Sequence, residues 1–259
     1  MKYFKKSLGQ NFLIDKNIIK KILKTVKIKN ENIIEIGPGR GALTDEILKM
    51  DPKKLILIEK DNSLVKELRL RYFGNKRVNI INSDILKFNL ENLANKNYII
   101  FGNLPYNISS QIIVKLIKLK WPPIFKNLVL MFQKELGEKI VGKFPSTNYG
   151  RLSILSNYRL NIIDKFLVSP NSFFPKPKVN SMVIHFQPKK KISYKIKNIE
   201  NLEKVTNILF SNKRKMINKN IKKLICSEKL KKIRNLKMSF RPTDIEPEIY
   251  YRITELIEC

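Results

Sequence analysis

The stretch that decides the fold is NIIEIGPGRGALT, which runs from Asn32 to Thr44. Its apolar, β-branched opening predicts a buried strand, and the residues after the glycines begin a helix. Between them lie Gly37, Gly39 and Gly41, and glycine lets the backbone approach a ligand that a Cβ would repel. The stretch therefore predicts a strand, a ligand-binding turn and a helix. Dinucleotide enzymes use a similar turn, so these residues alone do not name the ligand.

Outward from this stretch, short apolar runs rich in β-branched residues alternate with longer helical segments between residue 17 and about residue 186. This alternation is typical of a mostly parallel sheet with helices between its strands. The expected strands, about seven, are Asn32–Ile36, Leu55–Ile58, Val78–Asn82, Tyr98–Phe101, Leu128–Phe132, Ile162–Val168 and Ser181–Phe186. The expected helices are Leu43–Met50, Leu64–Tyr72, Ser109–Leu119 and Gln133–Val141. We therefore predict an α/β sheet domain with helices on both faces.

A polar, basic segment, Pro188–Lys191, ends the alternating pattern. Beyond it the apolar residues recur only at helical spacing, which predicts the helices Asn201–Phe210, Lys215–Leu224, Glu228–Asn235 and Pro247–Ile257. We therefore expect two domains: a ligand-binding sheet domain over residues 1–189 and a small all-helical domain over residues 190–259.

Charge is the second informative property of the chain. Its 259 residues include 52 Lys and Arg against 22 Asp and Glu, a formal net charge of +30, which favours a polyanionic partner such as a nucleic acid. Cys226 and Cys259 lack the spacing of metal ligands, and a reduced, cytoplasmic protein fits them best. Without a signal peptide or an apolar run of about 18 residues, we expect neither export nor membrane insertion. His185, inside an apolar run, is expected to be an ordinary strand residue.

Three further strand ends carry polar residues. Glu59 ends a strand about 20 residues after Gly37, where a carboxylate can meet the ribose hydroxyls of a nucleotide. Asp84 follows the next strand and can accept a hydrogen bond from an adenine amino group, and Asn103 follows the fourth strand. Nicotinamide enzymes share the turn and the first acid, but the set of Glu, Asp and Asn-x-Pro-Tyr describes a site for S-adenosylmethionine better. The sequence therefore predicts a methyl-donor site.

The fourth strand runs into Asn103-Leu104-Pro105-Tyr106, a group suited to an exocyclic amine on a flat base. The N6 lone pair of adenine is delocalised into the ring, so positioning helps more than a general base would. The Asn103 side-chain oxygen and the Leu104 carbonyl can accept the two N–H groups and turn the lone pair toward a methyl electrophile. Pro105 stiffens the backbone, and Tyr106 is expected to stack on the base.

Motifs along nearly the whole chain resemble the ribosomal RNA adenine N6-dimethyltransferases, most of all the bacterial enzymes that modify two adjacent adenosines near the 3′ end of small-subunit (16S) RNA. The matching segments are Lys6–Leu13, Glu35–Gly39, Asn103–Ser109, Gln133–Glu135, Tyr149–Ser153, Phe173–Val179 and Phe240–Pro242. The chain departs from the family at Ser7-Leu8, where Arg-Phe is common, and at Lys176, where proline is frequent. Both departures concern RNA affinity.

The resemblance implies a Rossmann-like class I methyltransferase domain and a helical C-terminal domain that binds RNA. It implies S-adenosylmethionine as the methyl donor and N6,N6-dimethyladenosine as the product during ribosome biogenesis, with small-subunit rRNA in a pre-30S particle as the partner. Phe173 is expected to stack on the second face of the target base, with Phe174 as the alternative. We expect a monomer. By matched position, the donor site is expected to comprise Asn11, Leu13, Gly37, Glu59, Asp84 and Asn103, beside Gly39 of the turn.

The basic side chains expected to contact RNA phosphates as a group are Lys5, Lys6, Lys176, Lys178, Arg214 and Lys215. Two alternative functions stay open. One is a large-subunit rRNA adenine methyltransferase of the kind that confers antibiotic resistance, against which Leu104 and the C-terminal match argue. The other is a non-catalytic nucleic-acid-binding factor on the same scaffold, which the intact set of Glu59, Asp84 and Asn103 disfavours.

Overall fold

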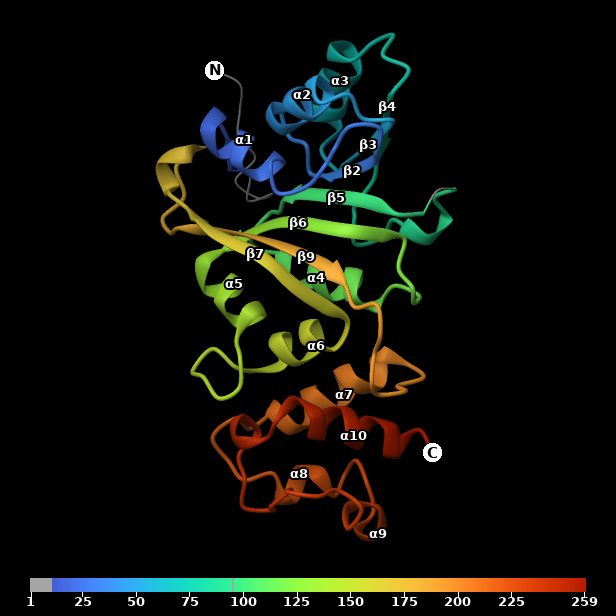
Figure 1. The fold of residues 1–259 in the computed structure, drawn as a ribbon. Helices are drawn as coiled ribbons and strands as arrows, with labels where there is room; N and C mark the ends of the chain where they lie inside the picture. The colour runs from blue at the N-terminus through green and yellow to red at the C-terminus, as the bar shows by residue number, and fades with distance from the viewer. Residues whose placement is uncertain (1–10, 95) are drawn as a thin grey trace. The chain divides into compact units, whose positions relative to one another are not determined.

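The computed structural model describes residues 11–94 and 96–259, which form two compact units (Figure 1). The first unit comprises the chain up to Gly137 together with Ile162–Pro188, and the second comprises Glu138–Asn161 and Lys189–Cys259. The last break between the units lies beside the boundary expected at residue 189. Residues 138–161, which we expected in the sheet domain, instead pack with the C-terminal helices. The RNA-binding role of the helical domain stays a prediction.

One sheet of seven strands has the order β4-β3-β2-β5-β6-β9-β7. Pairing is parallel from β4 to β6, whereas β9 runs antiparallel to β6. The expected seven strands are all present, and the predicted mostly parallel sheet is confirmed. Their bounds are β2 (Asn32–Ile36), β3 (Lys54–Glu59), β4 (Val78–Asn82), β5 (Tyr98–Asn103), β6 (Phe125–Gln133), β7 (Leu160–Val168) and β9 (Ser181–Pro188).

Helices connect the parallel strands and cover both faces of the sheet. On one face lie α1 (Lys16–Leu23) and α2 (Ala42–Lys49), and α4 (Ser109–Lys118) lies on the other (Figure 1). The helix α3 (Asn62–Arg71) connects β3 to β4, and α5 (Lys134–Val141) follows β6. Among the described residues, no helix combines the length and the hydrophobicity that a membrane span requires.

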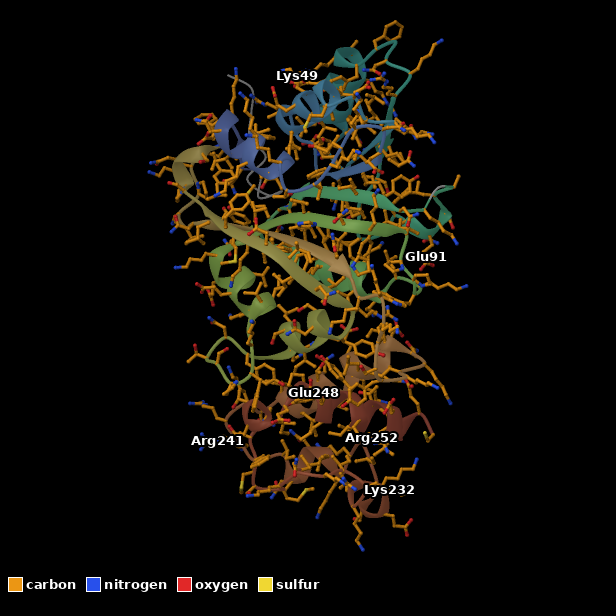
Figure 2. All side chains as sticks on the ribbon, in the orientation of Figure 1. Lys49, Glu91, Lys232, Arg241, Glu248 and Arg252 are labelled. Atoms are coloured by element: carbon orange, nitrogen blue, oxygen red, sulfur yellow. The ribbon has the colours of Figure 1, made fainter. Side chains whose placement is uncertain are left out.

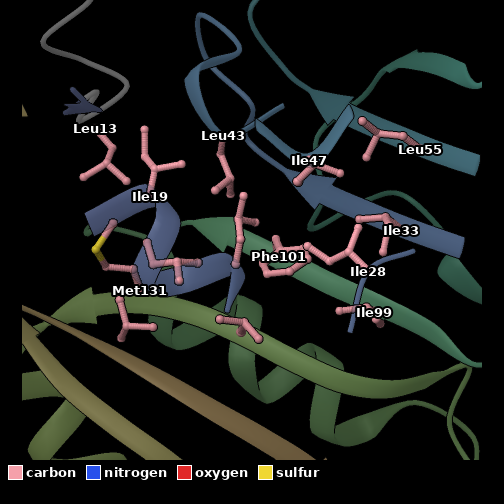
Figure 3. Close-up of a cluster of buried hydrophobic side chains, with 14 of the residues drawn as sticks. Leu13, Ile19, Ile28, Ile33, Leu43, Ile47, Leu55, Ile99, Phe101 and Met131 are labelled. Atoms are coloured by element: carbon pink, nitrogen blue, oxygen red, sulfur yellow. The ribbon is translucent and has the colours of Figure 1, made fainter. Parts of the chain in front are cut away.

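A hydrophobic core of the first unit lies between the sheet and the helices α1 and α2 (Figure 3). Ile33 of β2, Leu55 of β3 and Phe101 of β5 face these helices. The residues that alternate with them, such as Ile34 and Ile100, are equally buried. Because successive side chains of a strand point to opposite faces of the sheet, burial of both sets requires cover on both faces.

The second unit is built from α6 (Arg151–Arg159), α7 (Ile199–Phe210), α8 (Asn218–Ile221), α9 (Ser227–Leu230) and α10 (Pro247–Ile257). Buried tyrosines hold these segments together. The Tyr149 hydroxyl donates to the carbonyl of Ile245 (2.8 Å), and the Tyr251 hydroxyl of α10 donates to that of Ile154 in α6 (3.0 Å). Charged side chains of α10, among them Glu248 and Arg252, lie on this unit (Figure 2).

Several elements differ from the predictions. The helix expected over Lys215–Leu224 is reduced to α8, and that over Glu228–Asn235 to α9, although the apolar residues that suggested them are largely buried. The helical spacing correctly indicated which residues are buried. Short helices joined by turns bury these residues as well as one continuous helix would. The pattern did not reveal α1, α6, or the two-stranded ribbon of β1 (Phe12–Leu13) and β8 (Phe173–Phe174).

Truncation of a central core residue should destabilise the protein strongly. Phe101 is 0% exposed, so Phe101→Ala removes packing and leaves a cavity, and we expect it to lower the free energy of unfolding by about 3–5 kcal/mol. Phe73→Ala is the matched control: Phe73 is 91% exposed, and we expect a change within about 0.5 kcal/mol. Urea unfolding followed by circular dichroism measures both. Equal losses would contradict the placement of the core.

Candidate active site

The glycine-rich turn after β2 has a backbone that favours glycine at three positions. Gly37, Gly39 and Gly41 have φ angles of 67°, 57° and 81°, in the left-handed region. A Cβ on Gly39 would stand 2.8 Å from the ring of Phe12, so a larger residue requires the ring to move. The Gly37 N–H donates to the carbonyl of Ile58 (2.9 Å) and ties the turn to β3. The predicted tight turn is confirmed.

A cavity of about 330 Å³ opens where β2, β3, β4 and β5 end. These strands are parallel neighbours, so their carboxyl ends meet at one edge of the sheet. The structure brings together there every residue that the sequence predicted for the donor site. It also brings there all four residues of the Asn103–Tyr106 segment, which we call the Asn103–Tyr106 box. They are Asn11, Leu13, Gly37, Gly39, Glu59, Asp84, Asn103, Leu104, Pro105 and Tyr106. Their individual roles stay predictions.

Glu59, at the end of β3, is nearly buried and braces the turn. One carboxylate oxygen accepts from the Gly39 N–H (3.2 Å) and the other from the Asp61 N–H (2.8 Å). Burial raises the pKa of Glu59 above its usual 4.5, and the backbone donors oppose that rise in part. A carboxylate oxygen accepts more than one hydrogen bond, so Glu59 can hold the turn and still accept from a ligand hydroxyl.

Asp84, just past β4, is held by cationic and backbone donors. Lys60 Nζ donates to one oxygen (2.8 Å) and the Leu86 N–H to the other (2.9 Å). The hydrogen bond from Lys60 lowers the pKa of Asp84, which is therefore ionised at neutral pH. Lys115 of α4, which the sequence analysis missed, donates to the carbonyls of Leu86 (2.8 Å) and Phe88 (2.7 Å). These contacts hold the loop that carries Asp84.

Asn103, the last residue of β5, has a defined amide orientation. Its Nδ2 donates to the backbone carbonyl of Asn11 (2.9 Å), which lies 92 residues earlier in the chain. The amide has one nitrogen and one oxygen, so this bond assigns the nitrogen to Asn11 and leaves Oδ1 as an acceptor. The chemistry predicted for this residue requires an acceptor.

The turn after Asn103 is held from several sides. The Ile108 N–H donates to the Pro105 carbonyl (3.2 Å), and the Ser109 hydroxyl donates to the Tyr106 carbonyl (3.1 Å). The Tyr106 phenol oxygen lies 2.6 Å from Oγ of Ser181, and the two share a hydrogen bond. The ring of Tyr106 is half-buried and lines the cavity, as a stacking role requires.

The structure places Phe173 away from the cavity, which disfavours the predicted stacking of Phe173 on the target base and favours the alternative, Phe174. Phe173 is 2% exposed and belongs to the core, whereas Phe174 is 55% exposed and lines the cavity. Both belong to β8, which pairs with β1 so that Leu13 lies opposite Phe173 and Phe12 opposite Phe174. Adjacent strand residues point to opposite sides, and here Phe174 faces the cavity whereas Phe173 packs in the core.

The basic residues are only partly described. Lys5 and Lys6 lie outside the described residues. Lys176 and Lys178 are exposed in the segment after Phe174, and Arg214 and Lys215 are exposed on the second unit.

His185 lies in β9. It hydrogen-bonds Asn127 Oδ1 (2.7 Å) and lines no part of the cavity, in agreement with an ordinary strand residue.

Comparison with known proteins identifies the family of this chain. The family model described as "Ribosomal RNA adenine dimethylase" matches residues 1–258. The chain belongs to this family. It is 41% identical to "Ribosomal RNA small subunit methyltransferase A" of Pelagibacter ubique over 98% of this chain and 97% of that protein. The protein of the same name from Mycoplasmopsis synoviae is 41% identical, over 88% and 85% of the two chains.

Solved structures show the same architecture. A dimethyladenosine transferase from Plasmodium falciparum superposes with a TM-score of 0.75 at 28% identity, over 93% of this chain and 95% of that one. The 23S rRNA methyltransferase ErmE superposes with a TM-score of 0.70 at 21% identity, over 96% and 100%, and supports the fold alone. The expectation of an rRNA adenine dimethyltransferase with a class I methyltransferase fold is confirmed.

This rRNA adenine dimethylase also has a buried acid that was not among the predicted site residues. Glu35 of β2 is 2% exposed, lines the cavity and accepts a hydrogen bond from the Thr44 hydroxyl of α2 (2.7 Å). Burial raises its pKa to about 8, so the side chain is largely neutral at pH 7. An acid inside the otherwise apolar run Ile33–Ile36 was the available signal. Strand alternation places it on the face that α2 covers.

This burial predicts a pH dependence of stability. Glu35 has a folded pKa of about 8 against an ordinary 4.5, so between these values the native state retains a proton that the unfolded chain has lost. Stability must then fall as pH rises, by at most about 1.4 kcal/mol per pH unit from this group. Glu35→Gln removes the titration and keeps an acceptor for Thr44. Urea unfolding from pH 5 to 8 should therefore show the variant gaining stability relative to the parent, and a constant difference would contradict the assignment.

Proposed function

We propose that this enzyme transfers methyl groups from S-adenosylmethionine to N6 of two adjacent adenosines near the 3′ end of small-subunit rRNA. We propose that it acts as a monomer on a pre-30S particle in the cytoplasm. The observation that carries the proposal is the single cavity shared by the glycine turn, the strand-end carboxylates and the Asn103–Tyr106 box. Relatives named as small-subunit methyltransferases support the choice of RNA.

The residues present fit the proposed donor. The backbone at Gly39 lines the cavity and leaves no room for a Cβ, which would stand 2.8 Å from the ring of Phe12, and the Gly39 N–H donates to the carboxylate of Glu59. Glu59 can accept from ribose hydroxyls, and Asp84 from the adenine amino group. Bound S-adenosylmethionine supplies an electrophilic methyl group on a positively charged sulfur. The donor would be held by Asn11, Leu13, Gly37, Gly39, Glu59, Asp84 and Asn103.

Asn103 and Leu104 supply the acceptors for the target amine. The bond from Asn103 Nδ2 to Asn11 leaves Oδ1 to accept one N6 hydrogen, and the Leu104 carbonyl accepts the other. With both hydrogens drawn to one side, the N6 lone pair leaves conjugation with the ring and turns toward the methyl group. The same oxygens stabilise the positive charge that develops on nitrogen. No strong base is required before attack.

Two aromatic side chains are proposed to hold the base. Tyr106 and Phe174 both line the cavity, from the turn after β5 and from β8. An adenosine must leave its stack to reach a pocket at a sheet edge, and aromatic rings replace the lost stacking. The first transfer leaves a positive charge on N6 and S-adenosylhomocysteine as the by-product, and N6 then loses one proton to water. N6 keeps one hydrogen, so the second transfer requires the amine to rotate within the same acceptors.

A substitution at Gly39 tests donor binding. We expect Gly39→Ala to weaken binding of S-adenosylmethionine by roughly tenfold or more, because the new Cβ displaces the Phe12 ring from the cavity wall. Gly74→Ala is the matched control: Gly74 also has a left-handed φ, of 75°, but nothing lies within 4 Å of its Cβ position. Isothermal titration calorimetry should show unchanged affinity for Gly74→Ala. Equal weakening in both variants would assign the effect to backbone strain.

The reaction itself is tested with the full chain, tritiated S-adenosylmethionine and immature small subunits from cells that lack the modification. Mass spectrometry of the digested RNA should recover labelled N6,N6-dimethyladenosine. Asn103→Ala removes one of the two acceptors, and we expect its rate to fall on the order of 10²-fold. The exposed Asn92→Ala is the control and should retain the parent rate. Label confined to large-subunit RNA, or no label, would contradict the proposed substrate or activity respectively.

A further inference from the structure

We propose that Ser181 is a positioning residue for methyl transfer: its hydroxyl holds the phenol of Tyr106 and thereby sets the orientation of the ring on the target base. The two oxygens lie 2.6 Å apart, across 75 residues of chain. This inference rests on the proposed stacking role of Tyr106. Ser181 itself is fully buried and does not line the cavity, so it acts through Tyr106.

The residues that directly follow Ser181 in β9 are apolar, so packing alone does not explain a hydroxyl at this position. Ser181 is the first residue of β9, and Met182, Val183 and Ile184 after it are all buried and apolar. Burial of a hydroxyl is unfavourable unless it is hydrogen-bonded, and an alanine or valine would suit such a position better on packing grounds alone. The bond to Tyr106 accounts for the polar residue.

The same bond accounts for a tyrosine rather than a phenylalanine in the box. The backbone of Tyr106 is held by the Ser109 hydroxyl, which donates to its carbonyl. That contact fixes the backbone and does not itself set the orientation of the ring. The bond at the phenol end sets this orientation, so the ring is held at both ends before RNA arrives. Such preorganisation lowers the ordering required when the base enters.

Ser181 also stands where the second aromatic segment rejoins the sheet. The chain leaves β8 at Phe174 and enters β9 at Ser181, and the carbonyl of the preceding Asn180 accepts from the Lys134 N–H (2.9 Å). The start of β9 is therefore fixed to β6 and its following helix. Ser181 therefore bonds the ring of Tyr106 to a fixed part of the sheet, and the segment that carries Phe174 ends at this same part.

The test is a double-mutant cycle of Ser181→Ala and Tyr106→Phe, measured as single-turnover methyl transfer at saturating donor and RNA. We expect each variant to lower the rate roughly tenfold, because each loosens the same ring, and the double variant to lower it no further. Ser181→Thr keeps the hydroxyl and should restore most of the rate. Affinity for S-adenosylmethionine should not change in any of them. A parent rate for Ser181→Ala, or effects that multiply in the double variant, would overturn the proposal.

Ser156→Ala controls for a general effect of losing a buried serine. Ser156 is also buried, and its hydroxyl donates to the Ile140 carbonyl (2.9 Å) within the second unit. We expect it to lower the melting temperature as Ser181→Ala does, but to leave the rate unchanged. If Ser156→Ala lowered the rate equally, the effect of Ser181→Ala would be explained by lost stability, and the proposal would be overturned.

A readout without RNA separates this inference from the proposed function. The chain has nine tyrosines, and fluorine NMR of protein labelled with 3-fluorotyrosine identifies the Tyr106 signal as the one missing from Tyr106→Phe. Ser181→Ala should shift that signal alone among the tyrosines, whereas an unchanged signal would overturn the proposal. If the parent protein labels no small-subunit RNA, the proposed substrate fails, and the NMR result still decides whether Ser181 holds the ring.

Discussion

Parallel pairing of four neighbouring strands is the constraint on which the site depends. Because β2, β3, β4 and β5 run in the same direction, the residues that follow them all emerge at one edge of the sheet. The glycine turn, Glu59, Asp84 and Asn103 become neighbours there by topology and not by proximity in sequence. The buried apolar residues on both faces hold the strands in register, and so hold the spacing of the polar groups.

The polar groups of the cavity are oriented by the protein before any ligand binds. Gly39 and Asp61 donate to Glu59, Lys60 and Leu86 donate to Asp84, and Asn103 donates to Asn11. Each bond uses part of the capacity of its group and leaves an acceptor directed elsewhere. For methyl transfer to a weakly nucleophilic amine, orientation of acceptors is the main service that a protein can offer. The arrangement therefore suits the activity that family membership indicates.

Burial of carboxyl groups at this edge of the sheet is energetically unfavourable. Glu35 and Glu59 are both placed where water is largely excluded, and burial raises the pKa of each. Protonation of Glu35 near neutral pH limits the cost of burying a second acid beside Glu59. The hydroxyl of Thr44 and the backbone donors of the turn offset what remains. Glu59 thus supports the glycine turn through the Gly39 N–H, and Glu35 joins β2 to α2 through the Thr44 hydroxyl.

The sequence by itself determined the seven strands, the glycine turn, the strand-end residues and the Asn103–Tyr106 box, because these follow from local periodicity and from residue types with few alternative uses. The tertiary structure alone decided which of Phe173 and Phe174 reaches the cavity, since their exposure depends on how β8 pairs with β1. It also decided that residues 138–161 pack with the C-terminal helices, and that Asn11 meets Asn103 and Tyr106 meets Ser181. These contacts join segments far apart in the chain, and no local pattern of hydrophobicity or charge encodes which distant partner a side chain will find.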